Sequence, residues 1–215
     1  MDCCQCQGIE TKFDQKYAAK KLKQYRKDGP KKTTLQLIEA FQVDEDGQGL
    51  ELIDIGGGVG DIQHALLSTG IRSAINIEAS SAYLRACQEE AERQGHADQI
   101  THFQGNFVDL AEDIPSADIV TLDRVICCYH DMVQLVELSA QKAKRLYGVV
   151  YPRDTWWVKV GNLLYFNLRN WLARSPLRNF VHSTKAVEEV IRKNGLERCF
   201  YREMGPWQVV VFSRQ

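Results

Sequence analysis

Residues 50–60 read LELIDIGGGVG, with Asp54 shortly before glycines at positions 56, 57, 58 and 60. The first half is apolar and β-prone, and apolar residues resume from Ile62 onward. This order predicts a buried strand over 50–55, a tight turn, and a helix over 61–68. Glycine lets the backbone turn sharply and approach a ligand, and the first N–H groups of the helix lie beside the turn. We therefore expect a ligand-binding turn here.

Two kinds of nucleoside cofactor compete for this turn. The dinucleotide fingerprint G-x-G-x-x-G needs a third glycine, but that place falls on Asp61 or Gln63. What remains is Asp54-x-Gly56-x-Gly58-x-Gly60, which resembles motif I of the class I S-adenosylmethionine-dependent methyltransferases. The resemblance implies that the loop approaches the amino-acid end of the cofactor and that Asp54 helps to organise the site. A glycine-rich turn without a ligand is the remaining alternative.

A second acidic residue has the spacing of a ribose-binding carboxylate. Residues 72–78 read as a strand that ends at Glu78, 20 positions after Gly58. A carboxylate in this place accepts hydrogen bonds from ribose hydroxyls. It does so for a dinucleotide and for S-adenosylmethionine alike, so Glu78 supports a nucleoside cofactor without choosing between them. A surface glutamate is the structural alternative.

The rest of the chain continues the alternation of strands and helices. We expect strands over 100–104, 117–123 and 148–152 and helices over 80–94 and 131–146, which indicates parallel βαβ units. After a helix over 184–194, strands over 197–203 and 207–212 follow without a crossover and should pair antiparallel. The expected fold class is a Rossmann-like α/β three-layer sandwich, mostly parallel and closed by an antiparallel C-terminal hairpin, as in class I methyltransferases. We expect one domain over 1–215, with N-terminal helices within 12–43 and a helical insertion near 154–180.

Further candidate site residues follow the third and fourth strands, at the edge where open α/β sheets bind ligands. Asn106 and Phe107 come after the third strand, where the resembling family often places a residue at the adenine edge. The stretch from Asp123 to His130 resembles motif IV of that family. We take Asp123 as cofactor-binding, and Tyr129 and His130 as candidates for catalysis, His130 as a general base. A simple turn at Asn106 and a surface histidine at 130 are the alternatives.

Composition and net charge argue against several classes of protein. The chain of 215 residues has a net charge of −1, which gives no overall attraction to nucleic acid. It has no run of 18 apolar residues and no signal-peptide pattern at the start. Seven cysteines without an export signal predict reduced thiols and a cytoplasmic protein. Cys3 and Cys6 have C-x-x-C spacing, but no second pair completes a four-ligand metal site, so no metal is expected.

Two segments lie outside the regular alternation. Residues 13–27 are rich in Lys, Arg and Tyr and predict a helix, followed by a second one over 33–43. In the resembling fold the segment before the first strand often caps the cofactor pocket, but a solvated surface helix explains 13–27 equally well. Residues 156–172 are apolar and aromatic with basic flanks. They could wall an acceptor pocket, lie on a membrane surface through 154–174, or belong to the core.

The resemblance implies methyl transfer from S-adenosylmethionine to a small or medium-sized hydrophobic acceptor. The 13–27 helix and the 123–130 edge look loosely like the magnesium-protoporphyrin O-methyltransferase group. We expect a flat or elongated acid, held by stacking and ion pairing. The side chains behind that expectation are Arg153, Trp156, Trp157, Lys159, Tyr165, Arg169, Trp171 and Arg174. The alternatives are an NAD-dependent oxidoreductase and a non-catalytic cofactor-binding or membrane-surface module.

Overall fold

The computed structural model describes residues 4–41 and 49–215, and its centre is a seven-stranded sheet with the order β3-β2-β1-β4-β5-β7-β6. The strands are β1 (Glu51–Ile55), β2 (Ser73–Glu78), β3 (Ile100–Gln104), β4 (Ala117–Asp123), β5 (Ala143–Pro152), β6 (Leu196–Met204) and β7 (Trp207–Arg214). The first five run parallel, whereas β7 is antiparallel to both β5 and β6. The expected fold class, a mostly parallel sheet closed by an antiparallel hairpin, is confirmed.

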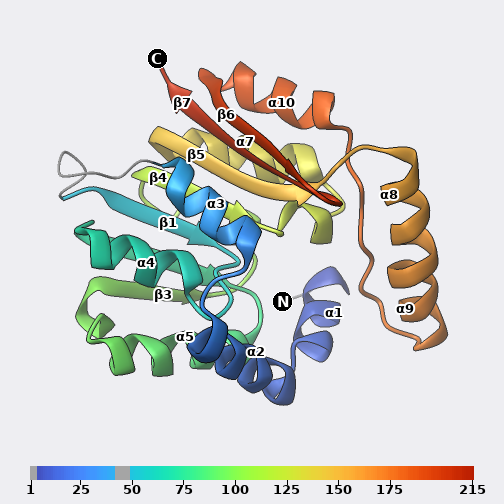
Figure 1. Cartoon of the computed structure of the whole chain (residues 1–215), viewed down its shortest axis with the longest axis horizontal. Coiled ribbons are helices and arrows are strands. Elements are labelled where there is room, and N and C mark those ends of the chain that lie inside the picture. The colour runs from blue at the N-terminus through green and yellow to red at the C-terminus, as the bar shows by residue number, and fades with distance from the viewer. Residues whose placement is uncertain (1–3, 42–48) are drawn as a thin grey trace.

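Helices cover both faces of this sheet (Figure 1). On one face lie α3 (Lys32–Ala40), α4 (Asp61–Thr69) and α5 (Ser81–Gln94), and on the other α6 (Phe107–Leu110), α7 (Met132–Lys142) and α10 (Thr184–Lys193). Near the ends of the parallel strands lie α1 (Cys4–Lys12), α2 (Gln15–Asp28) and a helical segment. That segment comprises α8 (Trp156–Gly161), the π-helical η4 (Asn162–Asn167) and α9 (Leu168–Leu172). The short turns η2 (Ala97–Gln99) and η3 (Ile126–Cys128) complete the order.

The alternation of side chains along the central strands divides the core into two layers. On β7, Val209 and Val211 pack toward α3 and α4, while Val210 and Phe212 pack toward α7 and α10. All four are fully buried. A strand covered on both faces is apolar at consecutive positions, as residues 209–212 of β7 are.

The third helix is anchored in the same core by the absence of a side chain at Gly148 of β5. A Cβ placed there would lie 2.4 Å from Cζ of Phe41 and 2.8 Å from Cδ1 of Leu37. Leu37 is fully buried and Phe41 nearly so. The helix α3 is therefore held against the sheet by close packing at this glycine.

Three of the expected boundaries are wrong. The helix expected over 131–146 ends at Lys142, and β5 begins five residues earlier than the expected strand, at Ala143. The strand begins earlier because Ala143 and Leu146 already pair with Ala117 and Ile119 of the parallel strand β4. The helix expected over 33–43 ends at Ala40. Val43, the last residue of the expected helix, lies outside the described residues. So does Cys3 of the C-x-x-C pair.

Candidate active site

The glycine-rich loop after β1 has the backbone that the sequence predicts. Gly56, Gly58 and Gly60 have φ values of +67°, +59° and +89°, which side-chain-bearing residues rarely adopt. A Cβ at Gly56 would lie 2.5 Å from Cγ2 of Val125, whereas one at Gly58 would meet only Tyr83, at 3.9 Å. The space beside Gly58 is therefore open on the side where a ligand would approach.

Asp54 lies shortly before the glycine-rich loop and is hydrogen-bonded to residues of α4 and β4. It is buried, and its carboxylate accepts hydrogen bonds from Nε2 of Gln63 at 3.0 Å and Oγ1 of Thr121 at 2.7 Å. Burial raises the pKa of Asp54 to about 7, against the effect of these two bonds. A Cβ at Gly57 would lie 2.3 Å from Nε2 of Gln63 and 2.6 Å from Oδ2 of Asp54. Gly57, which the motif leaves open, is thus the glycine with the least room.

Glu78 at the end of β2 joins the loop to the next helix. Its carboxylate accepts hydrogen bonds from the backbone N–H groups of Gly58 at 3.0 Å and Ser80 at 2.9 Å. Burial raises its pKa to about 7, although these bonds favour the charged form. Each carboxylate oxygen has two lone pairs, so both still have room to accept a ligand hydroxyl.

The ends of β3 and β4 contribute a second wall. Asn106 caps α6 through its side-chain oxygen and donates from Nδ2 to the hydroxyl of Tyr129 at 3.2 Å. Asp123 accepts a hydrogen bond from Oγ1 of Thr34 at 2.5 Å and lies 3.6 Å from Nη1 of Arg124. The start of α3 is thereby fixed to the end of β4.

These groups surround one cavity with a volume of about 1100 Å³. Eight of the ten residues expected at the site line it: Asp54, Gly56, Gly58, Glu78, Asn106, Phe107, Asp123 and Tyr129. The other two, Gly60 and His130, are not among its lining residues. Gly60 instead caps α4, where a Cβ would lie 2.8 Å from Nε2 of His64. His130 is exposed, and its ring stacks on that of Tyr129 with centroids 5.5 Å apart.

The cavity also contains charged residues that sequence reasoning did not single out. Lys31, Asp61 and Arg124 line it together. Burial and, to a lesser degree, Arg124 lower the pKa of Lys31, whereas burial and Asp123 raise that of Asp61 to about 6. Among the described residues, Asp61 Oδ1 is a buried oxygen without a hydrogen-bond partner. In the sequence, the one feature that indicates a charged residue at the site is the position of Arg124 directly after the fourth strand.

The helix α2 forms part of the cavity wall through Tyr17, Lys21, Gln24 and Tyr25. Of the two alternatives for residues 13–27, the structure therefore favours the pocket cap. The ring of Phe13 joins this wall and lies 5.3 Å from that of Tyr17. Aromatic side chains and a lysine of this N-terminal region thus line the cavity.

The helical segment over 156–172 is not core, so that alternative is wrong. Trp156 and Trp171 are 77% and 64% exposed. Of the side chains expected to hold an acceptor, only Tyr165 and Arg169 line the cavity, joined there by Phe166 and Asn170. The sequence predicts a helical segment that is apolar and aromatic with basic flanks, but spacing alone does not say which side of a helix faces the protein.

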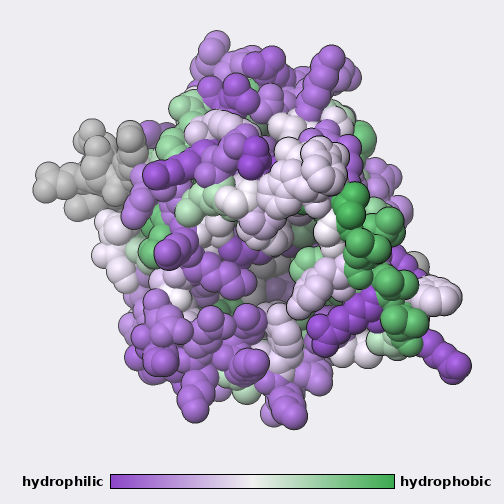
Figure 2. Space-filling model, turned by 45° about the vertical axis from the view of Figure 1, so that its right-hand side comes forward, coloured by the Kyte–Doolittle hydropathy of each residue, from purple (hydrophilic) through white to green (hydrophobic). Residues whose placement is uncertain are grey.

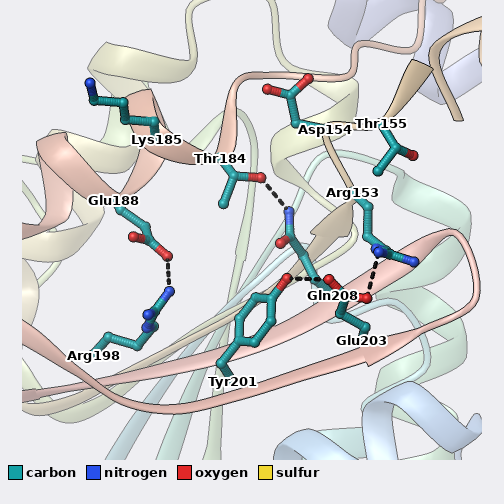
Figure 3. Close-up of a pocket in the computed structure, with 10 residues that line it drawn as sticks. All are labelled: Arg153, Asp154, Thr155, Thr184, Lys185, Glu188, Arg198, Tyr201, Glu203 and Gln208. Carbon is teal, nitrogen blue, oxygen red and sulfur yellow. Dashed lines mark hydrogen bonds and ion pairs between the residues drawn. The ribbon is translucent and has the colours of Figure 1, made fainter.

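Arg153 and Lys159, also expected near the acceptor, are paired elsewhere. Lys159 forms an ion pair with Asp154 at 2.5 Å. Arg153 lies in a smaller hollow of about 450 Å³ between α10 and the β6–β7 hairpin (Figure 3). Its guanidinium pairs there with Glu203 at 2.5 Å, and Arg198 pairs with Glu188 at 2.6 Å. Because its charges are mutually neutralised, this hollow is the weaker candidate for a site.

Comparisons with known proteins agree with the geometry of the larger cavity. Residues 53–145 match the sequence model of a family described as a methyltransferase domain. The crystal structure of magnesium protoporphyrin IX methyltransferase from Synechocystis PCC 6803 with bound SAH is similar with a TM-score of 0.75 and 16% identity, over 98% of this chain and 100% of that one. A putative methyltransferase from Haloferax volcanii, in complex with a methyltransferase activator, has a TM-score of 0.72 and 16% identity over 95% and 96%. No curated protein sequence matches.

An O-methyltransferase family protein from Burkholderia thailandensis is also similar, with a TM-score of 0.70 and 14% identity over 96% of this chain and 63% of that one. The sheet order and these similar structures show the fold of the class I methyltransferases, and the glycine-rich loop lies within the segment 53–145 that matches a methyltransferase domain. A second structure of the Synechocystis protein contains bound SAM. Within that class, the chain is similar in fold, over nearly its whole length, to the magnesium protoporphyrin IX methyltransferase. The match to a methyltransferase domain favours this class over the dinucleotide alternative.

Proposed function

We propose that the cavity binds S-adenosylmethionine along the carboxyl ends of β1, β2 and β3. The glycine loop around Gly58 receives the amino-acid end of the cofactor, and Glu78 accepts hydrogen bonds from the ribose hydroxyls. Asn106 and Phe107 lie at the adenine edge. The observation that carries the proposal is the convergence of the open side of Gly58 and the buried carboxylate of Glu78 on one cavity. When bound, the cofactor supplies an electrophilic methyl group.

We further propose that the acceptor is a hydrophobic molecule of small or medium size that bears an acidic group. The cavity wall supports this through aromatic side chains beside cations, which include Tyr165, Phe166, Arg169, Lys31 and Arg124. Aromatic faces stack on a flat ligand, and a guanidinium pairs with a carboxylate. A protein of this class with a named porphyrin substrate has the same fold, which is compatible with a large flat acceptor.

The catalytic work assigned to the chain is mostly alignment of acceptor and cofactor and exclusion of water. Tyr129 lines the cavity and is held by Asn106, so it is placed to orient the acceptor. A hydroxyl acceptor would also need a base, for which His130 remains the hypothesis, whereas a carboxylate acceptor would not. Asp61, with its unpartnered oxygen and raised pKa, is a further carboxyl group within the lining.

The proposal treats residues 1–215 as one domain of a cytoplasmic protein. Its N-terminal helices, within 12–43, lie over the cofactor, and the insertion near 154–180 lies beside the acceptor. A peripheral membrane contact through 154–174 would bring a hydrophobic acceptor to the cavity. The described residues contain no helix that is both long and apolar enough to cross a membrane.

Calorimetry with S-adenosylmethionine, S-adenosylhomocysteine and NAD tests the cofactor part of the proposal. We expect micromolar binding of at least one sulfur cofactor, about −8 kcal/mol, and none of NAD. Binding of NAD with no response to either sulfur compound would overturn it. Transfer of a labelled methyl group to a lipid-soluble extract fraction, lost in Gly58→Val, tests the transfer itself.

A further inference from the structure

The segment formed by α8, η4 and α9 presents its polar side to the protein. Asn162 and Asn167 both donate from Nδ2 to the backbone oxygen of Asn179, each at 2.8 Å, and the side-chain oxygen of Asn167 accepts from the backbone N–H of Asn179 at 2.8 Å. Asn170 is buried and donates to the backbone oxygen of Leu177 at 3.2 Å. The segment is thus attached mainly by a row of asparagines, together with the buried Val158 of α8.

The outward side of the same segment is apolar, which reverses the usual arrangement of a surface helix. Figure 2 shows it as a continuous hydrophobic stripe on the rim of the molecule. The exposed residues are Trp156 77%, Trp157 42%, Val160 45%, Leu163 60%, Leu164 59%, Tyr165 63%, Phe166 45%, Leu168 44%, Trp171 64% and Leu172 68%. We call this set the outer stripe. Contiguous apolar surface of this extent marks an interaction site.

Basic residues predominate around the outer stripe, where Asp154 at its start is paired with Lys159. The sequence contains no Asp or Glu between Asp154 and Glu188, while Lys159, Arg169, Arg174 and Arg178 all fall in that interval. Arg169 and Arg174 are exposed. Two copies of the chain meeting through this stripe would bring like charges together, which opposes self-association. An anionic surface is complementary to it.

We propose that the outer stripe docks onto the surface of an anionic lipid bilayer. A helix with a large apolar face, low overall hydrophobicity and basic residues at its margin lies in the plane of the interface, with its apolar side inserted. Tryptophan and tyrosine, which make up four of the ten stripe residues, are enriched at that depth. Lys and Arg near the surface add electrostatic attraction to acidic headgroups.

The outer stripe and part of the cavity wall belong to the same helical segment. Tyr165 and Phe166 belong to the stripe and also line the cavity, and Arg169 and Asn170 follow one turn later. Docking would therefore place the acceptor side of the cavity at the lipid surface. The docking specifies the membrane contact of the proposed function, and its test is separate because lipid binding needs neither cofactor nor acceptor.

Co-sedimentation with vesicles tests the docking, using the full chain without cofactor. We expect binding to vesicles of phosphatidylcholine mixed with phosphatidylglycerol, weaker binding to phosphatidylcholine alone, and release as salt is raised. Tryptophan emission should shift to the blue on binding, since several stripe residues are tryptophans. The double variant Leu163→Ser/Leu164→Ser should reduce the partition coefficient about tenfold or more.

The matched control is Leu35→Ser/Val133→Ser, which removes two aliphatic side chains, 40% and 49% exposed, that lie outside the stripe. It should bind vesicles like the parent chain. The proposal is overturned if the parent chain binds neither vesicle, or if the stripe and control variants bind alike. It is also overturned if sedimentation shows a dimer that only the stripe variant dissociates, without effect on vesicle binding. Cofactor calorimetry on the stripe variant separates these outcomes from failure of the proposed function, because cofactor affinity should be unchanged.

Discussion

Replacement of Glu78 by glutamine should change how the stability of the cofactor-free protein depends on pH. The folded pKa of Glu78 is raised from its ordinary value of 4.5 to about 7, chiefly because the group is buried. A raised pKa means that folding favours the protonated form. The stabilisation is therefore fully present below pH 4.5 and is lost as the pH rises through about 7. A glutamine at this position is neutral at every pH and cannot lose this stabilisation as the pH rises.

The magnitude follows from the same two pKa values. The interval between them corresponds to roughly 3 kcal/mol, of which about 2.5 kcal/mol falls between pH 5 and pH 8. The free energy of unfolding of Glu78→Gln, relative to the parent chain, should therefore rise by about 2.5 kcal/mol over that range. The sign holds even if glutamine loses one of the two backbone hydrogen bonds that the carboxylate accepts, because that cost is nearly independent of pH.

Urea unfolding at pH 5 and pH 8 measures this difference directly. Glu112→Gln, at an exposed position, is the control, and its relative stability should hardly change with pH. Asp54 is present in all three proteins, so its own raised pKa cancels in the comparison. A difference between Glu78→Gln and the parent chain that is the same at both pH values would refute the reasoning that Glu78 is buried without a compensating charge.

Three further substitutions test the loop and the acceptor side. Gly58→Val should abolish cofactor binding in calorimetry while the circular dichroism spectrum stays folded, since its Cβ meets only Tyr83 but enters the ligand space and the residue is strained at φ +59°. Gly57→Ala should instead lower the unfolding free energy by about 2 kcal/mol or more, because its Cβ displaces the Gln63–Asp54 hydrogen bond; unchanged denaturant midpoints would contradict this. His130→Ala should slow turnover about 100-fold if the acceptor is a hydroxyl and only slightly if it is a carboxylate, and a loss of similar size with both acceptor types would remove the base hypothesis.

The alternation of strands and helices was predictable because each element has a clear period and a clear stop. Ser80 and Asp131 cap their helices, and Gly95 ends α5, as the sequence indicates. The end of α7 was not predictable in this way. Lys142, Ala143 and the following residues continue a helical pattern, and only pairing with β4 decides that β5 starts at Ala143. Tertiary pairing overrode local preference there.

The cofactor side of the site was more predictable than the acceptor side for a physical reason. Asp54, Gly58 and Glu78 are fixed by backbone geometry, and glycine spacing reports backbone geometry directly. The acceptor wall depends on which side of a short amphipathic helix faces the protein. The three asparagines within 162–170 are hydrogen-bonded to the protein, so the aromatic side of the segment faces outward. In the sequence, three asparagines within an apolar stretch indicate this orientation. Lys31 reaches the cavity only because α3 packs on β5 far from it in sequence.

The close contact between Phe41 and Gly148 has a consequence for cooperativity. It ties α3, and through it the short connection to α2, to β5, the strand next to the central strand β4. A wall that is attached in this way does not open independently at low cost, so its backbone amides should exchange with solvent at rates close to those of the sheet. Occupancy of the cavity should then raise the melting temperature of the whole domain in one transition, rather than ordering the helices alone. A side chain at position 148 would separate the two events, and the helices would exchange first.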